Sequence, residues 1–211
     1  MTLQQSAHQH TQQRIVVGIS GASGVVYGVR LLQLLRQLGI ESHLVMSRSA
    51  QVTLAHETDL TVTQVHALAD RAYSSNDIGA AISSGSFPTS GMIVAPCSIR
   101  SLSEIASGVT TSLLTRAADV SLKERRRLVL MVRETPLHLG HLRSMTAATE
   151  AGAIIYPPVP AFYSRPRSLE EMIDHSLGRV LDLFGVDSAT VQRWDPRKTM
   201  GSSSETLSGT P

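Results

Sequence analysis

The first residues that could do chemistry are glycines and serines that follow a short apolar run near the start of the chain. The run Arg14–Ser20 leads directly into the loop Gly21–Gly24, and a helical pattern follows. In such a loop, backbone N–H groups and the hydroxyls of Ser20 and Ser23 gather at a helix N-terminus, which favours an anion. The loop therefore predicts phosphate binding, although a tight turn without a ligand would use the same residue types. The glycine spacing matches neither the dinucleotide fingerprint nor a Walker loop.

Serines also follow two later apolar runs. Ser47 is the last residue of the run Ile40–Ser47, and Ser98–Ser101 follow the run Gly91–Pro96. Each serine alone fits a helix N-cap. If the runs are parallel strands, their carboxyl ends lie at one edge of the sheet, where ligands of such folds bind. The three serine-bearing ends together predict a polar ligand laid across that edge.

Charged groups of both signs form a further cluster. Arg116, Asp119 and Lys123 share one face of a predicted helix. The run Arg127–Val132 ends in Arg133 and Glu134, and a cation beside a carboxylate can grip a phosphate and move a proton. The neighbouring basic residues 125–127 fit a solvated turn.

Three other groups could contribute chemistry. A proline-stiffened loop, Pro157–Tyr163, and Arg179 could together bind an anion, although Tyr163 considered alone fits a structural role. Cys97 fits a small core residue better than a nucleophile. His138 and His141, spaced i, i+3 without a carboxylate partner, make a poor metal site, and we predict no metal.

The elements that must position these residues alternate regularly. The three runs above, together with Arg127–Val132 and Ala153–Pro158, each predict a strand, and most of them are continuous apolar segments typical of strands buried on both faces. Helical spacing occurs in Val25–Leu38, Ser101–Arg116, Leu139–Ala151 and Leu169–Phe184. This order predicts a three-layer α/β fold with a doubly wound parallel sheet, Rossmann-like or flavodoxin-like, in a single domain.

Composition excludes several classes of protein. The chain has 211 residues and a net charge of +2, so we expect no basic face for nucleic acid. It has one cysteine and no apolar run of the roughly 18 residues that span a bilayer, so we expect a cytoplasmic protein without a membrane span. The polar ends, residues 1–13 and 196–211, are expected to be disordered on either side of one domain at 14–195.

Long ordered motifs resemble those of the flavin prenyltransferases of the UbiX type. They are GISGASG (Gly18–Gly24), SSGSF (Ser83–Phe87), PCSIRSL (Pro96–Leu102), LLTRAADVSLKERR (Leu113–Arg126), VRETPLHLGHL (Val132–Leu142) and PPVPAFY (Pro157–Tyr163). The resemblance implies a homo-dodecamer that joins the dimethylallyl group of dimethylallyl monophosphate to reduced FMN without a metal. It further implies that a UbiD-type decarboxylase receives the prenylated flavin.

The resemblance also implies roles for individual residues. FMN contacts are expected at Gly21, Ala22, Ser23, Ser47, Ser98, Ile99, Arg100, Ser101 and Arg133. The prenyl phosphate is expected to meet Arg116, Lys123, Tyr163 and Arg179, some of them from a neighbouring subunit. Glu57 and Glu134 match acidic groups near the reacting ring, and Glu134 with Ser23 is expected to handle protons.

Two positions depart from the family pattern, and two other functions stay open. Some members carry Trp within the segment 76–79, and Arg127 stands where Pro is usual. An FMN-dependent cysteine decarboxylase would share the fold, but it would carry a PASANT-like segment where this chain has residues 96–101. A non-catalytic FMN-binding decarboxylase subunit would not need the set of Arg116, Lys123, Tyr163 and Arg179.

Overall fold

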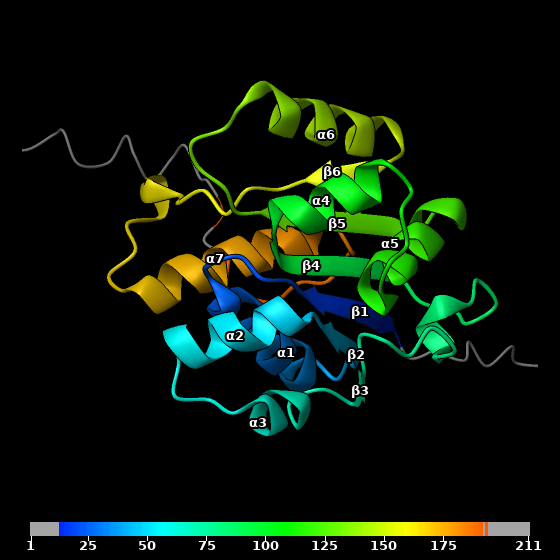
Figure 1. Ribbon diagram of the computed structural model, residues 1–211. Helices are drawn as coiled ribbons and strands as arrows, with labels where there is room; N and C mark the ends of the chain where they lie inside the picture. Colours follow the sequence, from blue (N-terminus) through cyan, green and yellow to red (C-terminus); the bar gives the residue numbers. More distant parts are fainter. Residues whose placement is uncertain (1–12, 192, 194–211) are drawn as a thin grey trace, which may run out of the picture.

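A computed structural model describes residues 13–191 and 193 of the chain (Figure 1). The described residues form a six-stranded parallel sheet with the strand order β3-β2-β1-β4-β5-β6. The strands are β1 (Arg14–Ile19), β2 (Glu41–Met46), β3 (Arg71–Tyr73), β4 (Gly91–Cys97), β5 (Arg127–Val132) and β6 (Ala153–Ile155). The helices are α1 (Val25–Gln37), α2 (Arg48–Glu57), α3 (Val62–His66), α4 (Ile99–Ala106), α5 (Leu113–Lys123), α6 (Leu139–Glu150) and α7 (Leu169–Asp182), with single 3₁₀ turns η1 (Ala81–Ser83) and η2 (Phe162–Ser164).

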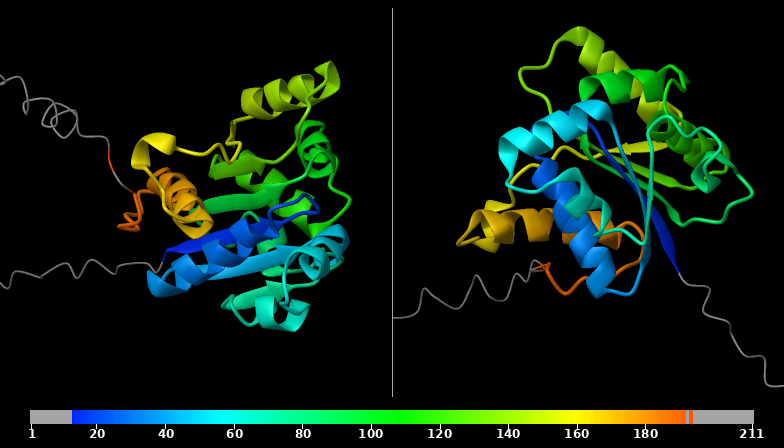
Figure 2. Two further views of the ribbon diagram at one scale, coloured as in Figure 1. Left: turned by 90° about the vertical axis from the view of Figure 1, so that its left-hand side faces the viewer. Right: turned by 60° about the horizontal axis from the view of Figure 1, so that its bottom comes forward.

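The sheet separates two apolar cores, which makes the fold three-layered (Figure 2). Alternate residues of β1 point to opposite faces, so Ile15 and Val17 belong to one core and Val16 belongs to the other. Helices α1, α2, α3 and α7 contribute to the first core, whereas α4, α5 and α6 contribute to the second. The predicted doubly wound α/β fold is confirmed, and the strand order is the Rossmann order rather than the flavodoxin order.

The strand order reverses between β1 and β4, and the Ser20 side chain links the ends of these two strands by hydrogen bonds. The Ser20 hydroxyl is fully buried and donates to the Pro96 carbonyl at 2.9 Å, while it accepts from the Ser98 backbone N–H at 2.7 Å. Gly28 of α1 lies over the end of β4, where a Cβ atom would come within 2.4 Å of the Ala95 carbonyl oxygen. The ends of β1 and β4 are therefore held in one arrangement, and the loops that follow them start from fixed positions.

Several predicted elements are corrected. The single helix expected at Ser101–Arg116 is two helices, because Gly108 adopts a φ of 70° after α4 and the Ser112 side chain caps a new helix, α5. The strand expected at Ala153–Pro158 ends at Ile155, before two prolines that lack the N–H needed for the sheet. Three elements, β3, α2 and α3, were not predicted.

The predicted ends of the domain are only partly described. Gln13, expected in a disordered extension, lies within the described part, where its side chain donates to the Phe184 carbonyl at 3.3 Å. Residues 1–12 and 196–211, for which disorder is predicted, lie outside the described residues. No helix in the described part is long and apolar enough to cross a bilayer.

Candidate functional site

A cleft of about 810 Å³ opens at the carboxyl edge of the sheet, at the point where the strand order reverses. Polar side chains dominate its walls. Of the predicted site residues, the cleft brings together Gly21, Ser47, Ser98, Ile99, Arg100, Ser101 and Glu134. Its other lining residues, which were not predicted, are Arg48, Ser49, Ser75, Asn76, Glu104, Thr111, Ser112, Leu114 and Thr115. Of the three serine-bearing strand ends expected at this edge, two bring serines to the cleft, Ser47 after β2 and Ser98 with Ser101 after β4, whereas the first loop contributes Gly21 and neither Ser20 nor Ser23.

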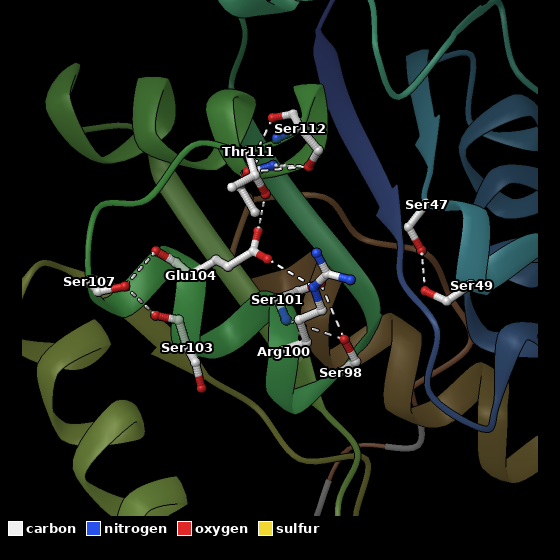
Figure 3. Close-up of polar contacts among 11 residues, drawn as sticks. Ser47, Ser49, Ser98, Arg100, Ser101, Ser103, Glu104, Ser107, Thr111 and Ser112 are labelled. Atoms are coloured by element: carbon white, nitrogen blue, oxygen red, sulfur yellow. Dashed lines mark hydrogen bonds and ion pairs between the residues drawn. The ribbon is translucent and has the colours of Figure 1, made fainter.

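Three helices, α2, α4 and α5, begin at this cleft, and their N-caps Ser47, Ser98 and Ser112 all line it (Figure 3). Ser47 caps α2 by accepting from the Ala50 N–H at 3.0 Å, and its Oγ lies 3.0 Å from that of Ser49. Ser98 caps α4 by accepting from the Ser101 N–H at 3.3 Å. The serines are therefore N-caps and cleft residues at once. The positive N-terminal ends of helices that open onto one polar cleft suit a phosphate group.

Gly21 allows the first loop to pass close to α2. A Cβ atom on Gly21 would lie 2.3 Å from both Cβ and Oγ of Ser49, well inside van der Waals contact. The glycine at this position is thus required by the close approach of two chain segments that both line the cleft.

Glu104 joins the two sides of the break between α4 and α5 (Figure 3). One carboxylate oxygen accepts from Nε of Arg100 at 2.9 Å, and the other accepts from the Thr111 hydroxyl at 2.7 Å. The Arg100 side chain is itself largely exposed, so the ion pair adds little stability but limits where the guanidinium can lie. The sequence contained one signal for this contact, the i, i+4 spacing of Arg100 and Glu104.

Glu57 occupies the start of α1, where phosphate had been predicted to bind. Its carboxylate accepts from the Gly24 N–H at 2.9 Å and from the Val25 N–H at 3.0 Å, and it also accepts from the Ser23 hydroxyl. These amides are therefore not available to a ligand in this arrangement. The first loop contributes Gly21 to the cleft, whereas Ala22 and Ser23 are not among the residues that line it.

The environment of Glu57 lowers its pKa. Burial of the carboxylate raises the pKa, but the hydrogen bonds from Ser23, Gly24 and Val25 and the positive charge of Arg133 together outweigh it. The ionised form is thus favoured in the folded protein. Glu57, expected to be catalytic, is placed here as a charged cap for α1 that also holds the Ser23 hydroxyl.

We predict that Glu57→Gln destabilises the protein at pH 7 but not in acid. A depressed pKa in the folded state contributes stability above the ordinary glutamate value of 4.5, and this contribution is lost as the pH falls through the lower folded value. A charged group at a helix N-terminus contributes about 0.5–1 kcal/mol. Urea unfolding of both proteins at pH 7 and pH 3 measures the difference. An equal difference at the two pH values would show that the charge of Glu57 has no part in it.

Arg133 and Glu134 lie at the end of β5, as predicted, and both side chains are exposed. Glu134 lines the cleft, and its carboxylate accepts from the Thr135 N–H at 3.0 Å. Arg133 does not line the cleft, but its charge acts on Glu57. Of the two glutamates expected near the reacting ring, Glu134 therefore lines the cleft, whereas Glu57 lies outside its lining, at the start of α1.

The four predicted phosphate ligands lie on opposite faces of the sheet. Arg116 and Lys123 belong to α5, and Lys123 is at the end of this helix, about 15 Å from the helix start that lines the cleft. Arg179 belongs to α7, which packs on the other face. The Tyr163 hydroxyl lies 3.4 Å from Nε2 of His175, a residue of α7, so Tyr163 is on the same side as Arg179. One chain therefore does not bring the four residues together.

Each predicted cation already has a partner in the same chain. Arg116 pairs with Asp119 at 2.7 Å, and Arg179 pairs with Asp182 at 2.8 Å. The Lys123 ammonium contacts the carboxylate of Glu124. All three cations are partly exposed, so a phosphate can compete for them at low cost in ion-pair energy.

One basic residue next to this group has a structural role that was not predicted. Arg126, expected in a solvated turn, donates to the Gly85 carbonyl at 2.6 Å and to the Phe87 carbonyl at 2.7 Å. It therefore holds the loop of the SSGSF motif against the end of α5.

Cys97 is a buried core residue, and His138 and His141 lie at the start of α6. Burial raises the pKa of the Cys97 thiol to about 12, so the thiol is protonated at neutral pH, as expected for a core residue. His138 accepts from the Gly140 N–H at 3.0 Å and caps α6, with the His141 ring beside it. Within the part of the chain that the structure describes, no group of three or more metal-ligating side chains occurs.

The donor set of the cleft fits a flavin mononucleotide. Serine hydroxyls and two helix starts suit its phosphate and ribityl chain, and Ile99 and Leu114 offer apolar contact to a ring. The volume of about 810 Å³ lies within the range of small-molecule sites.

Comparisons with known proteins agree with this donor set. The sequence profile of the family described as Flavoprotein matches residues 3–171. The flavin prenyltransferase UbiX of Escherichia coli K12 is 62% identical over 175 residues, which cover 82% of this chain and 93% of that protein. A crystal structure of AnUbiX in complex with FMN and dimethylallyl pyrophosphate is 52% identical, with a TM-score of 0.86 over 87% of this chain and 98% of that one. A dodecameric FMN-dependent UbiX-like decarboxylase from Escherichia coli O157:H7 is 46% identical, with a TM-score of 0.84 over 87% of this chain and 100% of that one.

Proposed function

The chain belongs to the Flavoprotein family and, within it, to the UbiX-type flavin prenyltransferases, and we propose that it joins a dimethylallyl group to reduced FMN. The observation that supports this most directly is the polar cleft at the carboxyl edge of the sheet, whose donor set fits FMN. The alternative of a cysteine decarboxylase is not favoured, because the segment 96–101 reads PCSIRS and the high-identity relatives are prenyltransferases.

The proposed reaction breaks the allylic carbon–oxygen bond, and the electron pair leaves with the phosphate. Reduced FMN, when bound, supplies the electron-rich ring that accepts the dimethylallyl group. Arg116, Lys123 and Arg179, with the Tyr163 hydroxyl, stabilise the charge that develops on the leaving phosphate. Glu134 is the proposed acceptor of the proton that the flavin ring would lose when the dimethylallyl group closes a new ring on it, since the Glu134 carboxylate lines the cleft. Ser23 is proposed to work beside it, oriented by Glu57.

FMN is proposed to bind through the serine edge of the cleft. Ser47, Ser98 and the starts of α2 and α4 would hold its phosphate, rather than the start of α1, where Glu57 accepts from the Gly24 and Val25 amides. The remaining proposed FMN contacts are Gly21, Ala22, Ser23, Ile99, Arg100, Ser101 and Arg133. Of these, Ala22, Ser23 and Arg133 would contact FMN only where the ligand extends beyond the cleft of one chain.

Assembly of several chains is proposed to complete the prenyl phosphate site. Arg116 and Lys123 lie on one face of the sheet and Arg179 on the other, so residues of at least two subunits must meet at each site. A solved relative is dodecameric, and we assign the same assembly to this chain. We further assign the product to a UbiD-type decarboxylase, and the protein to the cytoplasm, where its single thiol stays reduced.

The proposed activity is tested by weighing the product. Purified protein is incubated without oxygen with reduced FMN and either dimethylallyl monophosphate or the pyrophosphate, and the flavin is analysed by mass spectrometry. We expect a flavin heavier by one dimethylallyl group with the monophosphate. Unchanged FMN with both donors, from protein that binds FMN, would instead support a non-catalytic flavin carrier.

A further inference from the structure

A second hollow, of about 360 Å³, adjoins the flavin cleft at the carboxyl ends of β2 and β3. The two cavities share three lining residues, Arg48, Ser75 and Asn76. The hollow alone is lined by Met46, Gln51, His66, Ala72, Tyr73 and Ser74. None of these six residues has a part in the flavin site or in the prenyl phosphate site described above.

The hollow offers hydrogen-bond donors and no carboxylate. Arg48 and His66 are its basic residues, and neither Asp nor Glu lines it. Within the described residues, the side chains of Arg48, His66 and Gln51 form no hydrogen bond or ion pair. Unpaired donors that face a cavity without negative charge favour an anionic ligand that also accepts hydrogen bonds.

The position of the hollow in the sheet indicates which anion this is. In a doubly wound sheet of this strand order, a dinucleotide lies across the point of reversal, with one nucleoside over each half. The flavin cleft lies at that point, and the hollow lies over β2 and β3 in the first half. It therefore occupies the place of the second nucleoside.

The phosphates that join two nucleosides cannot bind at the start of α1 in this chain. In dinucleotide-binding proteins of this topology the pyrophosphate sits at the start of the first helix. In this chain Glu57 already accepts from the Gly24 and Val25 amides at that start. Arg48, in the first turn of α2, lines both cavities and is placed to receive the phosphate instead.

We propose that the hollow binds a nucleoside monophosphate group beside the flavin. Its volume is in the range of small-ligand pockets, Met46, Ala72 and Tyr73 give it an apolar wall for a base, and Gln51 offers an amide to the edge of the base. The group arrives either as the adenylate half of FAD or as free AMP next to bound FMN. The proposal rests on the proposed function only in placing a flavin in the neighbouring cleft.

Two variants separate the hollow from the flavin cleft. His66→Leu and Gln51→Leu change residues that line only the hollow, and Thr63→Ala, at an exposed position of α3, is the control. Flavin fluorescence measures the affinity of the apo-protein for FMN and for FAD, and calorimetry measures AMP binding to the FMN-loaded protein. We expect each variant to weaken FAD or AMP binding about tenfold, as for the loss of one hydrogen bond. FMN affinity is expected to stay the same in all three.

The FAD and AMP measurements distinguish a nucleotide that is part of FAD from a free one. A selective loss of FAD affinity identifies the flavin-linked adenylate, and a selective loss of AMP affinity identifies the free nucleotide. If AMP does not bind and the ratio of FAD to FMN affinity is the same in wild type and both variants, the hollow is not a nucleotide site. A failure of the proposed function would show separately, as loss of FMN binding or of prenylated product in the wild type.

Discussion

Lys123→Ala and Arg179→Ala are each expected to reduce prenyl transfer by roughly 10²–10³-fold while FMN affinity stays unchanged, as for the loss of one preorganised donor to a developing charge. When the two variants are co-expressed, however, activity should return. Lys123 lies on α5 and Arg179 on α7, on opposite faces of the sheet, so we expect each site to take the two cations from different chains. A mixed oligomer then contains sites in which both cations are present.

Co-expression of the two variants should restore about a quarter of the wild-type activity. With equal amounts of the two variants and random assembly, each of the two positions carries the intact cation with a probability of one half, so about a quarter of the sites are complete. Two affinity tags isolate the mixed oligomer, and product formation is measured per chain. The control is the Lys123→Ala, Arg179→Ala double variant co-expressed with itself. Activity of the mixed oligomer no higher than that of the single variants would place both cations in one chain.

The fold was predictable from the sequence wherever burial is complete. β1, β4 and β5 were predicted because they are nearly continuous apolar runs, β6 because it reads AII, and β2 (ESHLVM) on the apolar run of its last three residues. The short edge strand β3 has two exposed residues and one half-buried residue, so it carries no apolar signal. The break between α4 and α5 was missed because apolar residues at helical spacing continue on both sides of it, and only Gly108 and the Ser112 cap mark it.

The candidate site was predictable where it depends on strand ends. Ser47, Ser98 and Ser101 reach the cleft because parallel strands end at one edge, a rule that needs no knowledge of packing. The position of Glu57 needed such knowledge. It lies 33 residues from Gly24 in the sequence and reaches the start of α1 only because α2, an unpredicted helix, ends there.

The division of Lys123 and Arg179 between two faces shows another limit. Helical spacing correctly placed Arg116 and Asp119 together, and they form an ion pair of 2.7 Å. The same spacing does not show which face of the sheet a helix covers. That depends on the handedness and order of the crossover connections, and so on the whole topology.

Gly21→Ala is expected to reduce FMN affinity by about two orders of magnitude without unfolding the protein. The added Cβ would lie 2.3 Å from Cβ and Oγ of Ser49, so the first turn of α2 must move away from the first loop. That movement displaces the Ser47 cap and the helix start, both of which line the cleft. Hydrogen bonds to a charged group are worth about 1.5–3 kcal/mol each, and the loss of one or two of them gives this factor.

A compensating change tests whether the close contact is the cause. Ser49→Gly removes the two nearest atoms that the new Cβ would meet, and of the three nearest it leaves the Ser49 backbone carbon, at 3.0 Å. The Gly21→Ala, Ser49→Gly double variant should therefore regain most of the lost FMN affinity. Gly79→Ala is the matched control, because a Cβ there would meet only one Asp77 oxygen, at 3.6 Å. Fluorescence titration gives the affinities, and circular dichroism confirms that each variant is folded. If the double variant binds FMN no better than Gly21→Ala alone, the glycine is needed for a reason other than its approach to α2, such as direct contact of the loop with the flavin.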